Sequence, residues 1–137
     1  YVHLHPNCPA RNWVEEFSQY DAGWLHYYQS HNHGDLLRAN WIDLNSPARM
    51  STYAMAGLPM IMHNNAGHIV HHQRYLQSLG MAVAINDFGE LGDALSEPDN
   101  MQKLHENTWK NREAFCFDNY ADRLINFFRE VAEDARQ

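Results

Sequence analysis

Residues 45–63, NSPARMSTYAMAGLPMIMH, decide the fold because they join a helix directly to a buried strand. Asn45–Pro47 is a good helix start, with an N-cap candidate followed by a proline at the first helical position. Apolar residues then recur at helical spacing until Gly57, a residue type that commonly ends helices. Residues 58–63 have the length and apolarity of a strand buried on both faces. The segment therefore predicts a helix–strand unit of an α/β protein.

The sequence on either side continues the alternation of strands and helices. Upstream, we expect strands over residues 2–5 and 22–28 and a helix over 9–20 that carries Trp13, Val14, Phe17 and Tyr20 on one face. Downstream, we expect a helix between Gly67 and Gly80, a strand over 81–85, and helices over 88–96, 99–113 and 119–135. This order predicts a single α/β domain over residues 1–137. Its core would be a Rossmann-like open parallel sheet of about four strands, with helices on both faces and covering helices at the C-terminal end.

Composition restricts the possible functions. The 137 residues are 45% hydrophobic and 20% charged, which is typical of one globular domain with its own core. The net charge of −7 and the absence of a basic stripe argue against a nucleic-acid partner. No apolar run approaches the roughly 20 residues of a membrane-spanning helix. The two cysteines, Cys8 and Cys116, form neither a CxxC motif nor a disulfide framework, which is typical of the reducing cytoplasm.

Two features of the sequence suggest a ligand site. Residues 30–46 form a polar connection, with a helical turn expected over 35–40, and connections of this length in compact domains are usually functional. The helix start that follows would offer unpaired backbone N–H groups at positions 48–50, and Arg49 could add a bidentate contact to phosphate. Ligands of open α/β sheets bind where this loop would lie, at the carboxyl ends of the strands. The alternative is a simple capped helix with Arg49 in solvent.

The segment around Arg49 resembles the nucleotide-sugar-binding helix in the C-terminal domain of GT-B glycosyltransferases. The family pattern S-P-x-K/R-hydrophobic-x-E-Y-hydrophobic-A-x-G-x-P-hydrophobic-I is matched here by Ser46, Pro47, Arg49, Met50, Tyr53, Ala56, Gly57, Pro59 and Ile61. SQYDAGWLHYY (residues 18–28) resembles the family's helix–Asp–strand, and NREAFCFDNYADRLINFFREV (residues 111–131) resembles its closing helices. The resemblance covers most of the chain. Because the sequence starts at Tyr1 and not at Met, we expect a fragment of a two-domain protein's C-terminal donor-binding domain, incomplete at its N-terminal side.

The resemblance also implies roles for individual residues. Arg49 would neutralise charge on the leaving nucleotide, and Tyr53 would pack the helix against the nucleoside side of the cleft. Thr52 stands where the family has an acidic residue that binds the ribose hydroxyls, and Asp43 is a possible substitute. The donor-binding residues implied are Ser30, His31 and His33 from the long loop, with Asn45, Ser46, Ala48, Arg49, Met50, Thr52 and Tyr53.

The implied reaction is transfer of a sugar from a nucleotide-diphospho-sugar to a hydroxyl acceptor. The family is typically metal-independent, and the chain has no DxD motif, so neither a metal nor another cofactor is expected. The acceptor would bind to an N-terminal domain of the parent chain, which leaves the catalytic residues unassigned and this fragment alone inactive.

Two other functions remain open on the sequence. The chain could be a non-catalytic Rossmann-like interaction module that has lost its ligand. It could also be a histidine-rich metal-binding domain, since it has ten histidines and His68 and His72 are spaced to share a helix face. The glutamate of an HExxH motif is missing, however, because positions 69 and 70 are Ile and Val. The sequence contains neither a GxGxxG dinucleotide motif nor a GxSxG nucleophile motif.

Overall fold

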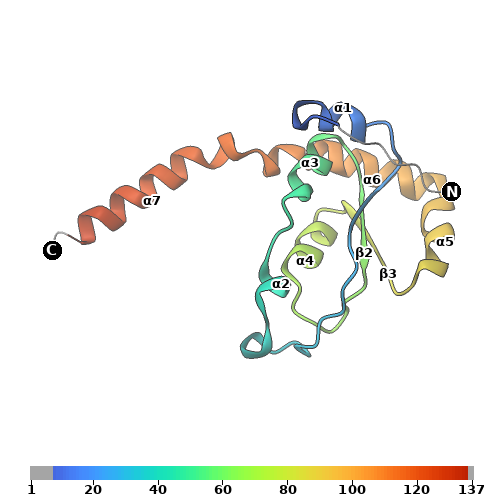
Figure 1. Ribbon diagram of the computed structural model, residues 1–137, viewed down its shortest axis with the longest axis horizontal. Coiled ribbons are helices and arrows are strands. Elements are labelled where there is room, and N and C mark those ends of the chain that lie inside the picture. Colours follow the sequence, from blue (N-terminus) through green and yellow to red (C-terminus); the bar gives the residue numbers. More distant parts are fainter. Residues whose placement is uncertain (1–7, 136–137) are drawn as a thin grey trace.

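The centre of the fold is a small parallel sheet, seen in a computed structural model that describes residues 8–135. Its strands are β1 (Gly23–His26), β2 (Met60–His63) and β3 (Ala82–Ile85), in the spatial order β1-β2-β3 (Figure 1). β2 pairs with both neighbours, and its register with β1 shifts between Trp24 and His26. The expected α/β class and parallel sheet are therefore confirmed.

The sheet differs from the expectation in two respects. It has three strands in the described residues instead of four, and the fourth expected strand, residues 2–5, lies outside them. The order β1-β2-β3 also runs in one direction, whereas a doubly wound Rossmann sheet reverses its order at a switch point. The described residues thus form a small open sheet and do not form a Rossmann fold.

Helices and short 3-10 turns connect the strands and follow the last one. In chain order they are η1 (Ala10–Asn12), α1 (Trp13–Phe17), η2 (Leu36–Arg38), α2 (Trp41–Leu44), α3 (Arg49–Met55), α4 (His71–Ser78), η3 (Phe88–Glu90), α5 (Leu91–Ser96), α6 (Pro98–Asn111), η4 (Arg112–Phe115), η5 (Phe117–Tyr120) and α7 (Ala121–Asp134). Each helix expected from the apolar periodicity is present, although α1 ends at Phe17 and leaves Tyr20 outside it.

The expected N-cap of the helix after residue 45 is wrong. Asn40 and Asp43 form a capping box that starts α2, an unexpected helix inside the long loop. The backbone N–H of Asn45 donates to the Trp41 carbonyl, so Asn45 ends α2 and does not start the next helix. α3 begins later, after Ala48, without a side-chain cap. The capping box of Asn40 and Asp43 therefore makes Asn45 the end of α2, where the sequence pattern predicted the start of the next helix.

One buried cluster joins the sheet to α3 and α4. Its members are Leu25, Met50, Ala54, Met60, Met62, Leu76 and Met81. Alternate residues of β2 point into this cluster, and α3 and α4 supply the opposite side. The cluster fixes α3 against the strands and therefore fixes the position of Arg49 at its first turn.

The last helix leaves the body of the molecule. α7 extends away from the sheet and from α6 (Figure 1), and none of its residues, all of them described, is buried. The apolar stripe expected on it is present, with Leu124, Phe127, Phe128 and Val131 all exposed. Within residues 8–135, no helix combines the length and apolarity that crossing a membrane would require.

Two glycines give a matched test of the packing between α3 and β1. A Cβ atom at Gly23 would lie 2.8 Å from Leu58 Cδ2 and from Tyr53 Cε2, whereas one at Gly92 in α5 would meet nothing within 4 Å. We expect Gly23→Ala to lower the free energy of unfolding by about 1–3 kcal/mol, because it overpacks the contact with Tyr53. Gly92→Ala should raise it by up to about 1 kcal/mol through helix propensity. Urea unfolding of both variants checks this, and equal effects would contradict the packing.

Candidate functional site

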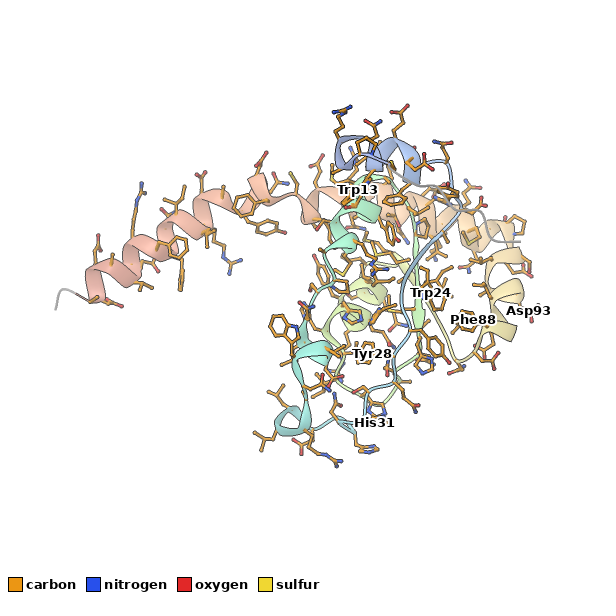
Figure 2. The ribbon with its side chains drawn as sticks, viewed as in Figure 1. Trp13, Trp24, Tyr28, His31, Phe88 and Asp93 are labelled. Atoms are coloured by element: carbon orange, nitrogen blue, oxygen red, sulfur yellow. The ribbon has the colours of Figure 1, made fainter. Side chains whose placement is uncertain are left out.

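A cavity of about 590 Å³ lies between α1 and α3. Trp13 and Phe17 line it from α1, and Pro47, Ala48, Arg49, Thr52 and Tyr53 line it from the start of α3 and the residues before it. Figure 2 shows Trp13 where α1 meets α3. The Tyr53 ring meets the Phe17 ring edge-to-face at 5.2 Å, and the Tyr53 hydroxyl donates to the Trp24 carbonyl at 3.3 Å. The volume is that of a small-molecule pocket, with aromatic walls and one cation.

Arg49 is the charged group of this cavity. It is exposed at the first position of α3, and within residues 8–135 its guanidinium has neither a carboxylate nor a hydrogen-bond acceptor as a partner. A cation held in a cavity without a counter-charge is available to an anionic ligand. The Thr52 hydroxyl lies in the same cavity, one helical turn further along.

The backbone near Arg49 offers fewer donors than the sequence suggests. The Met50 N–H donates to the Pro47 carbonyl at 2.9 Å, and the Met50 side chain belongs to the buried cluster. Pro47 itself has no N–H. Any anion in the cavity would therefore be held mainly by the Arg49 side chain, with Ala48 beside it.

The other implied donor-binding residues lie at a different place, beyond the end of β1. Figure 2 shows Tyr28 and His31 on the segment that follows this strand, away from Trp13. Ser30 is buried, and its N–H donates to Asn65 Oδ1 at 2.7 Å. His31 is exposed. His33 has a left-handed backbone, with φ of 50°, and its N–H donates to His68 Nδ1 at 3.1 Å.

The structure thus divides the ten implied residues into groups. Ala48, Arg49, Thr52 and Tyr53 share the cavity, whereas Ser30, His31 and His33 lie on the loop after β1. Ser46 and Met50 line a smaller cavity of about 360 Å³ near Tyr75 and Phe115. Asn45 lines neither cavity, and its carbonyl oxygen forms a hydrogen bond with His72 Nδ1 at 3.1 Å.

Two asparagines that the sequence did not single out hold these loops in place. The Asn32 side chain donates to the Ile69 carbonyl and accepts from the Ile69 N–H, each at 2.9 Å. The Asn65 side chain accepts from Ser30 N–H and donates to the Tyr28 carbonyl. Both asparagines are buried. In the sequence the two asparagines are polar residues in the loops that follow β1 and β2, and this position cannot reveal their partners.

Asp43 belongs to this buried network and does not line the Arg49 cavity. Its carboxylate accepts from Asn40 N–H at 3.0 Å and lies 3.5 Å from the Tyr28 hydroxyl. Burial alone would raise the pKa of Asp43, but hydrogen bonds from the Asn40 backbone and from nearby side chains outweigh it and hold this pKa below its ordinary value. Burial, together with the charge of Asp43, raises the pKa of Tyr28.

Two histidines pack against each other beside this network. The rings of His26 and His72 lie 4.2 Å apart, and the Tyr28 ring lies 4.7 Å from His26. Burial, followed in decreasing order by the neighbouring charges of His72, Arg49 and His63, lowers the pKa of His26 to about 4. Burial also lowers the pKa of His72. Both imidazoles are therefore neutral near pH 7.

His68 and His72 do not share the helix face that their spacing suggested. α4 begins at His71, so His68 lies before the helix and does not share a helical face with His72. His68 Nδ1 is occupied by the His33 N–H, and His72 Nδ1 by the Asn45 carbonyl. Within residues 8–135, three metal-ligating side chains do not come together anywhere.

Comparison of the chain with protein-family models, with curated proteins and with solved structures gives no match, so the site is interpreted from its own chemistry. That chemistry consists of an unpaired cation and a hydroxyl in an aromatic cavity, with a buried histidine pair tied to the same loop.

The buried histidines make stability depend on pH. The pKa of His26 is about 4 in the folded chain and near 6.5 when unfolded, so the unfolded chain binds more protons between these values. We expect the free energy of unfolding to be highest above pH 6.5 and to fall as the pH is lowered toward 4. Asp43 affects this pH dependence only at lower pH. Because its pKa is lowered by folding, its contribution to the free energy of unfolding is fully present above 3.8 and is lost only as the pH falls below that value. Urea unfolding at pH 7.5, 6.5 and 5.5 measures the slope, which should be shallower in His26→Phe. An equal slope in that variant would contradict the assignment.

Proposed function

We propose that the chain is the donor-binding part of a glycosyltransferase that moves a sugar from a nucleotide-diphospho-sugar to a hydroxyl acceptor. The observation that carries this proposal is the Arg49 guanidinium, unpaired with any described residue, in a cavity of about 590 Å³. The likeness of residues 45–63 to the nucleotide-sugar-binding helix of GT-B enzymes supports the same function.

The diphosphate, the nucleobase and the ribose of a nucleotide-sugar each have a candidate partner in the cavity. The planar guanidinium of Arg49 can bind a diphosphate through two hydrogen bonds at once. The rings of Trp13 and Phe17 offer apolar surface on which a nucleobase can stack. The Thr52 hydroxyl is a neutral partner for a ribose hydroxyl, where an acidic residue would bind more strongly.

Arg49 would also serve the reaction itself. Negative charge accumulates on the diphosphate as the bond to the sugar breaks, and a fixed cation beside it stabilises that charge. We therefore propose a metal-independent transfer in which Arg49 is the charge-stabilising residue. The acceptor and the remaining catalytic groups would come from an N-terminal domain of the parent protein, and the complete donor domain would be Rossmann-like.

A non-catalytic interaction module is the second candidate. It is favoured by the exposed apolar side chains of α7, whose exposed fractions reach 55% at Phe127 and 59% at Phe128. An exposed apolar helix face is typical of a protein–protein contact. Such a module would have no need of an unpaired arginine in an aromatic cavity, and for that reason we prefer the transferase.

The proposal predicts a specific loss in one variant. Arg49→Ala should weaken binding of UDP or GDP by about 1–3 kcal/mol, or about 5- to 150-fold, because it removes the charge-assisted contact. Arg38→Ala is the matched control, since Arg38 is an exposed arginine in η2 that does not line the cavity. Thermal-shift titration followed by calorimetry measures both affinities.

Three results of this experiment are informative. Loss of affinity in Arg49→Ala alone would support the site. Equal affinity in the wild type and Arg49→Ala would remove Arg49 from it. Absence of binding by every nucleotide diphosphate, in a chain shown to be folded, would favour the interaction module.

A further inference from the structure

The His26–His72 pair contains three of the four buried side-chain polar atoms that have no hydrogen-bond partner in residues 8–135; the fourth is His63 Nδ1. Both ring nitrogens of His26 and the Nε2 atom of His72 are buried and have no hydrogen-bond partner in residues 8–135. Buried polar atoms are nearly always paired, and each one left unpaired costs about 1–3 kcal/mol. His72 itself is 1% exposed. Because of this cost, we look for a ligand-bound state of the protein in which one of these nitrogens gains a proton or a hydrogen bond.

The charges around the pair come from every element packed against it. Tyr28 follows His26 on the same segment, His63 ends β2, and His71 is the neighbour of His72 on α4. Asp43 on α2 supplies the negative charge, but its carboxylate is already bonded to the Asn40 N–H. Arg49 at the start of α3 supplies the positive charge, and its repulsion opposes protonation of His26.

A hydrogen bond ties the pair to the segment that leads to the proposed ligand site. His72 Nδ1 lies 3.1 Å from the Asn45 carbonyl oxygen, and residues 45–49 lead from this carbonyl to Arg49. Because a carbonyl only accepts hydrogen bonds, Nδ1 must carry the proton of neutral His72. Nε2 is then the free basic atom, and it belongs to the ring that packs against His26.

We propose that His26 and His72 form, together with Arg49, a proton-linked anion site: a diphosphate bound at Arg49 draws one proton from solvent onto the imidazole pair. The imidazolium then adds its positive charge to that of Arg49. This inference rests on the proposed function, because it requires a diphosphate in the Arg49 cavity. The only covalent change is the uptake of one solvent proton at a ring nitrogen.

The direction of the effect follows from the charges. Burial, the largest cause of the low pKa of His26, remains, but a bound diphosphate cancels the repulsion from Arg49 and adds an attraction of its own, so this pKa rises from about 4 toward, at most, its ordinary value of 6.5. Linkage then requires that protonation strengthen ligand binding by the same factor. A shift of this size makes the affinity on the order of tenfold higher at pH 5.5 than at pH 7.5.

The test uses UDP-glucose, GDP-mannose and ADP-glucose as probes. Their phosphates are diesters without a proton to exchange in this pH range, so any proton taken up binds to the protein. Isothermal calorimetry at pH 7.5, 6.5 and 5.5, in two buffers of different ionisation enthalpy, gives the affinity and the number of protons taken up. We expect net uptake, with the affinity rising about tenfold on acidification.

Two variants locate the proton. His26→Asn should lose the pH dependence of binding. His105→Asn is the matched control, because His105 also bonds a backbone carbonyl through Nδ1, that of Gly57 at 3.1 Å, but lies on α6. If His26→Asn does not fold, the NMR titration of the wild-type histidine rings, with and without probe, reports the same proton.

The outcomes separate this inference from the proposed function. A rise in affinity that is lost in His26→Asn and kept in His105→Asn supports the proton-linked site. Binding that is independent of pH, or a rise that persists in His26→Asn, overturns it and leaves the donor-binding function standing. If none of the probes binds the folded wild type at any pH, the proposed function fails and this inference with it.

Discussion

The position of the candidate site depends on the side-chain amide of Asn65. Its oxygen accepts from the Ser30 N–H at 2.7 Å, and its nitrogen donates to the Tyr28 carbonyl at 3.1 Å. The Asn65 backbone N–H donates to Gln73 Oε1 on α4 at 2.9 Å. One residue therefore joins the exits of β1 and β2 to the helix that carries His72. Parallel strands this short share few backbone hydrogen bonds. The hydrogen bonds of Asn65 therefore help to hold the long loop, and with it α2 and the start of α3, in place.

The parts of this fold that could be predicted from the sequence are those fixed by local patterns. The apolar runs and the glycines at 57 and 80 placed β2, β3, α3 and α4 to within a few residues, because burial on one face imposes a period on the sequence. The predicted start of α3 is wrong. The capping box of Asn40 and Asp43 starts α2 just upstream, so Asn45 ends that helix, and the sequence pattern does not show which of two nearby capping signals is used.

The site was predictable only in part, for a similar reason. Arg49, Thr52 and Tyr53 come to one cavity because a single helix carries them, and helical spacing can be read from the sequence. Trp13 and Phe17 reach that cavity from α1, through packing that sequence spacing does not encode. The buried contacts of Asn32, Asn65 and His72 each join residues 27 or more positions apart, and such pairings depend on the whole fold. Histidine spacing alone suggested that His68 and His72 share a helix face, but α4 begins at His71, and within residues 8–135 no three metal-ligating side chains come together.

The distribution of charge gives the cavity its chemical character. The chain carries a net charge of −7, yet within residues 8–135 Arg49 has no acidic side chain as a partner. The nearest buried carboxylate, Asp43, is turned into the loop network by bonds from the Asn40 N–H, where its lowered pKa keeps it ionised. Arg49 differs from the other cations that lack an ion pair within residues 8–135 because it lines the aromatic cavity. A single guanidinium in a cavity of about 590 Å³ suits a small, doubly charged ligand better than an extended polyanion, because the net charge of −7 disfavours association with a long run of negative charges.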